Sequence, residues 1–351
     1  MKLTRKTPLA GPSFSPIGLE LRGRWMKAAQ AVGPRWRLAR VERVVPPGPR
    51  SWLPQPDAVA RLDGALRAAG FQGETLILAA PSAALLSQSL ELPPKSSGAP
   101  IEALAIAEMA RACRMEPGTL ETAMWETPGG GRAGVSNLLA MGMDHASASH
   151  LLSAFDHSSM TPITIDASPA ALGRLPRHSP ESAHAFVDVG WDDTVLCIVL
   201  GGLPIYQRRL DDGGLAAAYN DIAARDSATP AAVDSVLFPA GAMHADAQAD
   251  VVRATLLSRW RGSISNVIEP LAKELDRSLT YASHRFPTTP IVSVNLCGDG
   301  ALLPGLADRL QSKVSSVPVA AVPDAAFAVA QGLCSWTGTL AGRSFFAAEA
   351  A

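Results

Sequence analysis

The stretch Ala185-Phe-Val-Asp-Val-Gly-Trp-Asp-Asp-Thr-Val-Leu-Cys-Ile-Val-Leu200 decides how this chain is organised. It is rich in β-branched and other apolar residues, which favour strands. A Gly201-Gly202 turn follows, and residues 203–210 continue the pattern. We therefore expect a β-meander that opens a structural unit of its own near residue 185.

The N-terminal region has the same form. Residues 17–32 predict two short strands that turn at Arg22-Gly23, and residues 35–45 predict a third. Apolar residues at helical spacing predict a helix over 56–70. The continuous apolar run at 75–80 predicts a strand that is buried on both faces. The chain thus opens in the order β-β-β-α-β.

The second region repeats this order after its meander. We expect helices over about 213–225 and 252–285, a buried strand over 290–296, a helix over 303–314 and a closing helix over 324–333. The long helix has one continuous apolar face. Gly262 or Pro270 predicts a break that divides it into two helices.

An inserted α/β subdomain is expected between the two regions. Strands are predicted at 84–92, 119–127 and 135–143, helices at 101–114 and 145–159, and a plain hairpin turn at Gly129-Gly-Gly131. The fold class is therefore α/β, with two βββαβα units and one insertion. The expected boundaries are a flexible tail at 1–14, a first domain at 15–82, the insertion at 83–160, a second domain at 161–338 and a C-terminal tail at 339–351.

Composition excludes several classes of function. The 351 residues include 31 Lys and Arg against 32 Asp and Glu, so the net charge of −1 disfavours a nucleic-acid partner. The four cysteines lie far apart, which predicts reduced thiols in a reducing compartment and no zinc site. The longest apolar run, at 195–206, is shorter than the roughly 20 residues of a membrane span. We expect a cytoplasmic protein.

Two similar units predict a phosphate site between them. In such a site, backbone N–H groups of each hairpin face the phosphates, and a carboxylate on the first strand orients Mg²⁺ through water. Asp188, Gly190 and Thr194 meet this requirement in the second half, with Asp188 as the expected group for the metal.

The first half fits this pattern less well. Glu20 stands at the carboxylate position and Gly23 supplies a glycine, but Arg22 stands where the backbone must approach the phosphate. In one interpretation Glu20 reaches a metal-bound water and Arg22 contacts phosphate through two hydrogen bonds. In another, Arg22 fills the site and replaces the nucleotide. An ion pair between Glu20 and Arg22 in an empty cleft is a third interpretation.

A third element follows the buried strand at 290–296. Gly298 and Gly300 would let the backbone pack against a ribose and base, and Lys273 and Glu274 on the opposing helix are candidate contacts for them. The structural alternatives are a solvated helix face for Lys273 and Glu274, and a turn-stabilising role for Asp299.

The order of these segments resembles the PilM family of type IV pilus assembly proteins, actin-like relatives of the division protein FtsA. The resemblance extends over about residues 15–335 and implies an actin-like ATPase fold with two RNase H-like domains. It also implies that Lys27 belongs to the cofactor-binding set. The matching segments are Ile17-Gly-Leu-Glu-Leu with Lys27 downstream, Leu90-Glu-Leu-Pro-Pro94, Ile165-Asp-Ala-Ser-Pro-Ala-Ala-Leu172, Val187-Asp-Val-Gly190, Glu274-Leu-Asp-Arg-Ser-Leu279 and Asn295-Leu-Cys-Gly-Asp-Gly-Ala-Leu-Leu-Pro-Gly-Leu306.

This resemblance implies a cytoplasmic scaffold that holds ATP and Mg²⁺ between its halves. It further implies that the scaffold binds the cytoplasmic tail of an inner-membrane PilN-like partner and meets other pilus platform proteins. The protein would then be attached to the inner membrane through its partner, with the peptide in a groove of the inserted subdomain. Because the first phosphate loop is altered, we expect slow or no ATP hydrolysis.

Two other functions share this architecture. One is the cytoplasmic part of a type II secretion L-type protein, which normally continues into a membrane helix. The other is a kinase of the sugar or acetate kinase fold, which needs an intact first phosphate loop and a catalytic acid beside it. The segment Glu20-Leu-Arg22 argues against the kinase.

Overall fold

The computed structural model describes residues 14–46, 48, 50–128, 135–175, 181–211, 213–237, 247–314 and 317–336. The predicted C-terminal tail, the N-terminal tail up to residue 13 and the glycine turn at 129–131 lie outside these residues. Within the described ranges, no helix combines the length and the hydropathy needed to cross a membrane. The four cysteines are free, as their spacing predicts, and three of them are buried.

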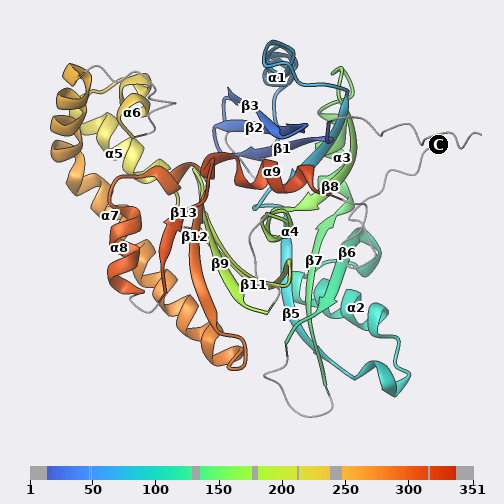
Figure 1. Ribbon diagram of the computed structural model, residues 1–351. Coiled ribbons are helices and arrows are strands. Elements are labelled where there is room, and N and C mark those ends of the chain that lie inside the picture. The colour runs from blue at the N-terminus through green and yellow to red at the C-terminus, as the bar shows by residue number, and fades with distance from the viewer. Residues whose placement is uncertain are drawn as a thin grey trace, which may run out of the picture.

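The first sheet has the strand order β3-β2-β1-β4-β8 (Figure 1). Its helices lie on opposite faces: α1 and α3 share one apolar core with β1, whereas α9 packs against β1 and β2 from the other side. The elements are β1 (Ile17–Arg22), β2 (Trp25–Val32), β3 (Arg35–Glu42), α1 (Pro56–Ala68), β4 (Thr75–Ala80), α3 (His145–Ser153), β8 (Thr161–Ala167) and α9 (Ala328–Cys334).

The second sheet repeats the first, with the order β11-β10-β9-β12-β13. One face of this sheet is covered by apolar side chains from α5, α6, α7 and α8. Helix α4 packs on the other face of the sheet, near α9. The elements are α4 (Ser168–Gly173), β9 (Ala183–Val189), β10 (Thr194–Leu200), β11 (Leu203–Leu210), α5 (Ala216–Asp226), α6 (Pro230–Leu237), α7 (Ala247–Arg285), β12 (Ile291–Cys297), α8 (Leu306–Lys313) and β13 (Val319–Ala321).

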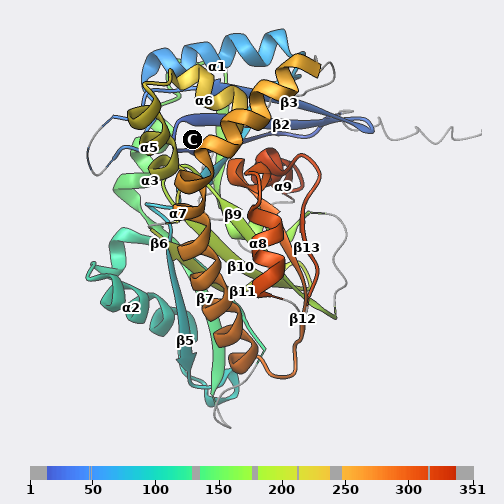
Figure 2. The same cartoon turned by 90° about the vertical axis from the view of Figure 1, so that its left-hand side faces the viewer.

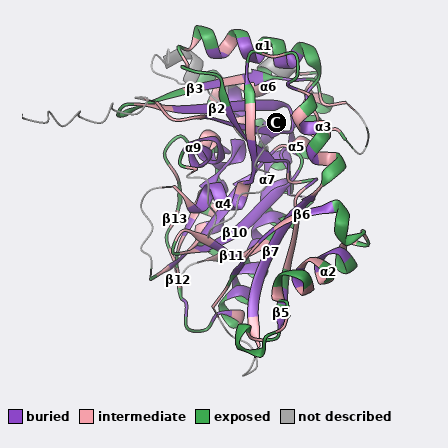
Figure 3. Cartoon of the chain, turned by 90° about the vertical axis from the view of Figure 1, so that its right-hand side faces the viewer, coloured by how far each residue is buried: buried purple, intermediate pink, exposed green. Residues whose placement is uncertain are grey.

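The third sheet, of order β5-β7-β6, lies in the inserted region. Helix α2 covers one face, and the other face packs Trp125, Leu139 and Met141 toward α4 and β11 (Figure 3). The elements are β5 (Leu86–Leu92), α2 (Ile101–Cys113), β6 (Leu120–Glu126) and β7 (Ser136–Asp144). Short 3₁₀ turns at Lys95–Ser97, Pro117–Thr119, Asp299–Leu302 and Ala325–Phe327 complete the described elements.

Two features differ from the sequence prediction. Helix α7 is continuous from Ala247 to Arg285 (Figure 2), so the predicted break is wrong. Pro270 removes one hydrogen bond, but Ile264, Ile268 and Leu271 stay buried against the sheet on both sides of it. Strand β8, which the predicted boundary assigned to the second half, pairs in parallel with β4 of the first sheet.

Candidate functional site

The two equivalent hairpins, β1–β2 and β9–β10, meet where the halves join. Side chains alternate along a strand. In β1, Ile17, Leu19 and Leu21 enter the core with α1. Glu20 and Arg22 therefore point to the opposite side, toward the second half, and both are buried.

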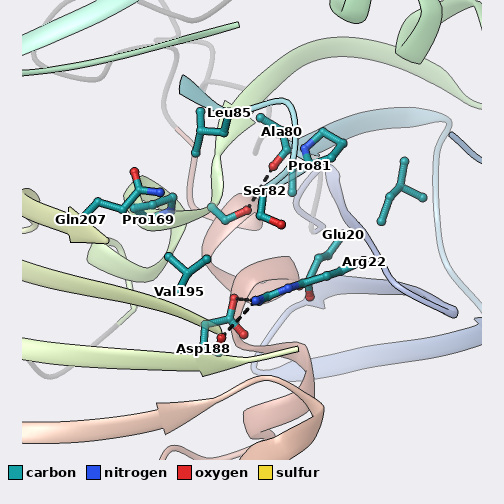
Figure 4. A pocket seen from close by; sticks show the side chains of 13 residues that line it. Glu20, Arg22, Ala80, Pro81, Ser82, Leu85, Pro169, Asp188, Val195 and Gln207 are labelled. Atoms are coloured by element: carbon teal, nitrogen blue, oxygen red, sulfur yellow. Dashed lines mark hydrogen bonds and ion pairs between the residues drawn. The ribbon is translucent and has the colours of Figure 1, made fainter. Parts of the chain in front are cut away.

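Arg22 is the centre of the contact between the hairpins. Its Nη1 pairs with Oδ2 of Asp188 at the end of β9. Its Nη2 donates to Asp193 Oδ1 at 2.6 Å, and to the carbonyl oxygens of Asp188 at 3.1 Å and Asp193 at 2.9 Å. Figure 4 shows the guanidinium directed at Asp188 across the interface. One guanidinium thus satisfies acceptors on both sides of the second hairpin's turn.

Glycines let these groups approach closely. A Cβ atom at Gly190 would overlap the Arg22 guanidinium. Gly298 has φ of 79°, in the left-handed region, and a Cβ there would collide with the Asp188 carboxylate. A Cβ on Gly300 would meet the side chain of Val189. The glycines expected to accommodate a nucleotide therefore accommodate the protein's own side chains.

Asp193 is held by three different residues. Besides Arg22, the Ser82 hydroxyl donates to Oδ2 at 2.7 Å, and Arg209 Nε donates to the same oxygen at 2.6 Å. Burial alone would raise the pKa of Asp193, but these donors hold it below its usual value. The pKa of Arg22 is raised because Asp188 and Asp193 outweigh its burial. Both groups stay ionised in this interface.

Lys27 forms a second buried contact between the halves. Its Nζ lies 3.0 Å from Glu20 Oε2 and 3.4 Å from Oδ2 of Asp299, which follows β12 in the second half. Arg40 Nη1 lies 3.8 Å from the other oxygen of Asp299. Glu20 therefore pairs with Lys27, and the predicted pair between Glu20 and Arg22 is wrong. Asp299 bridges the halves, whereas the sequence suggested a local turn stabiliser.

Glu20 is the titratable group of this cluster. Burial raises its pKa to about 7, despite the opposing effect of Lys27. Its Oε1 has no hydrogen-bond partner among the described residues, and neither does Oδ1 of Asp188. The cluster therefore holds a carboxyl group that gains or loses a proton near neutral pH.

A third cation, Arg24, joins the halves nearer the surface. It pairs with Glu42 of β3, and its Nη2 lies 3.0 Å from Oδ2 of Asp234 in α6. The guanidinium also lies over the Trp191 and Tyr219 rings, at 5.1 Å and 5.0 Å from their centroids. Cation–π contacts of this kind add to the ion pairs.

Trp191 has a clear structural role in this cluster. Gly23 has φ of 55°, and a Cβ there would overlap Trp191. The two hairpin turns, Arg22–Arg24 and Gly190–Asp193, therefore pack directly against each other.

The space left between the hairpins is too small for a nucleotide. The cavity lined by Glu20, Arg22, Ser82 and Asp188 has about 10 Å³ available to a water-sized sphere, whereas small-molecule sites measure roughly 300–1,000 Å³. Arg22 already engages Asp188, the carboxylate expected to orient Mg²⁺. No cluster of three His, Cys, Asp or Glu suited to a metal occurs in the described ranges. The residues in this arrangement do not fit Mg·ATP.

The predicted site residues separate into two groups. The larger group surrounds the two hairpins, where Thr194 donates to the Gly213 carbonyl at 2.7 Å and so stabilises the turn. Lys273 is exposed on α7, and Glu274 pairs with Arg208 and Arg277. The residues that meet between the halves are Glu20, Gly23, Lys27, Asp188 and Gly190, whereas Gly298 and Gly300 pack within the second half against Asp188 and Val189.

The sequence did not identify several members of this site. These members are Asp193, Asp234 and Ser82, which contact the first hairpin or its partners. No local sequence pattern reveals these contacts, because the residues lie far apart along the chain; Arg22 and Asp193 are 171 positions apart. A clue was available in composition. The β1–β2 hairpin carries Arg22, Arg24 and Lys27, whereas the β9–β10 hairpin carries Asp188, Asp192 and Asp193 and no Lys or Arg.

Comparison with known proteins supports the fold alone. No protein-family model matches the sequence, and no curated protein matches it. A solved structure described as a PilM–PilN type IV pilus biogenesis complex matches with a TM-score of 0.67 at 21% identity, covering 92% of this chain and 98% of the other. The ethanolamine utilization protein EutJ from Carboxydothermus hydrogenoformans matches with a TM-score of 0.55 at 13% identity, over 93% of this chain and 91% of its own.

The first of these matches confirms the resemblance to PilM at the level of the fold. It spans both sheets and the inserted region, because it covers nearly the whole of each chain. The chain therefore has the actin-like α/β fold that its two repeated meanders predict.

Proposed function

We propose that this protein is a non-motor scaffold of a type IV pilus assembly machine, which binds the cytoplasmic tail of a PilN-like inner-membrane protein. The similarity to the PilM–PilN complex supports the pilus assignment. The protein would be cytoplasmic, and its partner would attach it to the inner membrane and to other platform proteins.

We further propose that the scaffold works without nucleotide. The observation that carries this proposal is the position of Arg22, whose guanidinium lies against Gly190 and pairs with Asp188 and Asp193. A phosphate would need the same backbone approach and would compete with two buried carboxylates for one cation. The kinase alternative loses support for the same reason.

The inserted region is the proposed docking place for the partner tail. Its small sheet ends in β5 and β6, each of which pairs only with β7 among the described strands. An extended peptide can add to such an edge through main-chain hydrogen bonds. The opposite face of this sheet is packed on the second half, where the Trp125 indole N–H donates to the Pro204 carbonyl. This face therefore anchors the insertion to the second half, and β5 and β6 remain the edge strands of the sheet among the described strands.

The test is calorimetry with a peptide from the cytoplasmic tail of a PilN-like protein from the same organism. We expect saturable binding of the peptide with the same Kd in the presence and absence of millimolar Mg·ATP. We expect no heat of binding from Mg·ATP alone. Saturable Mg·ATP binding that Asp188→Ala abolishes would overturn the nucleotide-independent mechanism. Absence of peptide binding would overturn the partner assignment, whatever the result with nucleotide.

A further inference from the structure

The tip of the β2–β3 hairpin protrudes from the molecule. Residues 33–37, Gly-Pro-Arg-Trp-Arg, are all exposed, and Trp36 keeps 40% of its surface in solvent. Figures 2 and 3 show the same hairpin from opposite sides, extending past the helices that cover the first sheet. An indole at such a tip contributes little to the core, although it carries a large apolar area.

The two arginines at this tip have no ion-pair partner among the described residues. Most other surface arginines pair with an acidic neighbour, as Arg61 does with Asp57 and Arg111 with Glu108. Arg35 and Arg37 make no ion pair or hydrogen bond with any described residue. Side chains alternate along β3, so Arg35 and Arg37 lie on one face of the tip, with the Arg37 guanidinium near Gly70, and the exposed Trp36 indole lies on the other face.

The sequence that precedes this part of the fold is also basic. Phe14 forms a β-bridge with Val32, so the N-terminal segment joins the fold beside the tip. The sequence before it contains Lys2, Arg5 and Lys6 and no acidic residue. The neighbouring loop contributes the single carboxylate of Glu74. A chain of net charge −1 thus has one strongly basic end.

We propose that this tip is a membrane contact, with Arg35 and Arg37 on the headgroups of anionic phospholipids and Trp36 at the boundary of headgroups and acyl chains. Arginine side chains bind phosphate through paired hydrogen bonds, and tryptophan favours the membrane interface. Basic residues close to an anionic surface each add to the affinity, and the attraction fades within a Debye length. The tip meets this requirement because it protrudes. The inference is independent of the proposed pilus function.

The test is co-sedimentation of the full chain with phosphatidylcholine vesicles and with mixed phosphatidylcholine and phosphatidylglycerol vesicles. We expect binding to the anionic vesicles only, weakened by added salt. Arg35→Ala/Arg37→Ala should lower the partition coefficient by about 25-fold, because one basic residue contributes about fivefold. Trp36→Ala should lower it further, and Arg35→Lys/Arg37→Lys should keep most of the binding.

A control lies on α7, where Arg277 and Arg285 lie near the exposed Tyr281 ring, but Arg277 pairs with Glu274. Arg277→Ala/Arg285→Ala should bind vesicles like the unmodified chain. Equal binding of neutral and anionic vesicles would overturn the proposal, as would full binding by Arg35→Ala/Arg37→Ala. If the chain binds a single-stranded oligonucleotide through the tip and does not bind vesicles, the partner of the tip is nucleic acid and the membrane proposal is overturned.

Discussion

The hairpins β1–β2 and β9–β10 occupy equivalent places in their sheets and carry opposite charge. The first presents Arg22, Arg24 and Lys27, and the second presents Asp188 and Asp193 around a glycine turn. Two hairpins of like design would leave room for a charged ligand between them. Two hairpins of opposite charge bind each other instead. The difference teaches that opposite charges on equivalent strands of a repeated fold can create a buried interface between its halves.

Removal of Arg22 should produce the largest effect. Arg22→Met leaves Asp188 and Asp193 buried without their main cation, and we expect the free energy of unfolding to fall by about 3–5 kcal/mol. Urea denaturation followed by circular dichroism measures this. Arg61→Met, which breaks the exposed pair with Asp57, is the control and should cost less than about 1 kcal/mol. Similar losses for both variants would mean that the hairpins are not held by charge.

Removal of Lys27 should cost less, about 3 kcal/mol, although its side chain is fully buried. Glu20 can accept a proton, and Arg40 remains close to Asp299, so the carboxylates keep partial compensation. A double-mutant cycle with Lys27→Met and Glu20→Gln measures the coupling by urea denaturation. We expect Glu20→Gln to recover part of the loss. Additive losses would contradict a direct ion pair.

The pH dependence of stability isolates Glu20. Its pKa is raised from 4.5 to about 7, so the folded state binds a proton more tightly than the unfolded state does. Stability from this group is therefore fully present below pH 4.5 and is lost as the pH rises to about 7. The expected loss between about pH 5 and pH 7 is about 2 kcal/mol.

The comparison is between the unmodified chain and Glu20→Gln, each unfolded in urea across this pH range. Glutamine imitates the protonated carboxyl group and cannot titrate, so the variant should lose this part of the slope. Other buried acids, such as Asp166, contribute equally to both proteins. An unchanged difference between the two proteins from pH 5 to 7 would show that Glu20 titrates normally.

Arg24 should have the smallest effect of the three cations. Glu42 is largely exposed, so the ion pairs are partly solvated, and we expect Arg24→Ala to cost about 1–2 kcal/mol. Hydrogen exchange should show faster opening of α6, which holds Asp234. The control Glu274→Ala removes exposed pairs within the second half and should cost less than about 0.5 kcal/mol. Unchanged exchange in α6 would exclude Arg24 as a link between the halves.

Most of the fold was predictable because local patterns determine it. The predicted strand at 75–80 matches β4, and the two meanders appear as strands in the expected order. The prediction of helices and strands was less accurate where tertiary packing determines where an element begins and ends. Helix α7 continues through Pro270 because its apolar face has a sheet to cover, and β13 is three residues long and depends on pairing with β12.

The site was predictable only in its second half. Asp188 and Gly190 follow a recognisable spacing, and replacement of the nucleotide by Arg22 was one of three interpretations of the sequence. What Arg22 contacts was not readable, since Asp193 lies 171 positions away. Lys273 and Glu274 were candidate contacts for a ribose and base, but the contacts of Glu274 are with Arg208 and Arg277. Contacts between distant segments depend on how the halves dock, which no local pattern specifies.

The order of synthesis determines when the Lys27–Asp299 contact can form. The two residues are 272 positions apart, and α9, whose Ala330 carbonyl lies against Gly18, is made later still. A ribosome that adds about 5–20 residues per second needs roughly 15–50 seconds to cover that distance. During this time the first hairpin is complete in sequence, but its cations have no acidic partners from the second half. The first sheet of the nascent chain is thus completed by α9, the last of the described helices to leave the ribosome, and premature termination would release a basic, incompletely covered fragment.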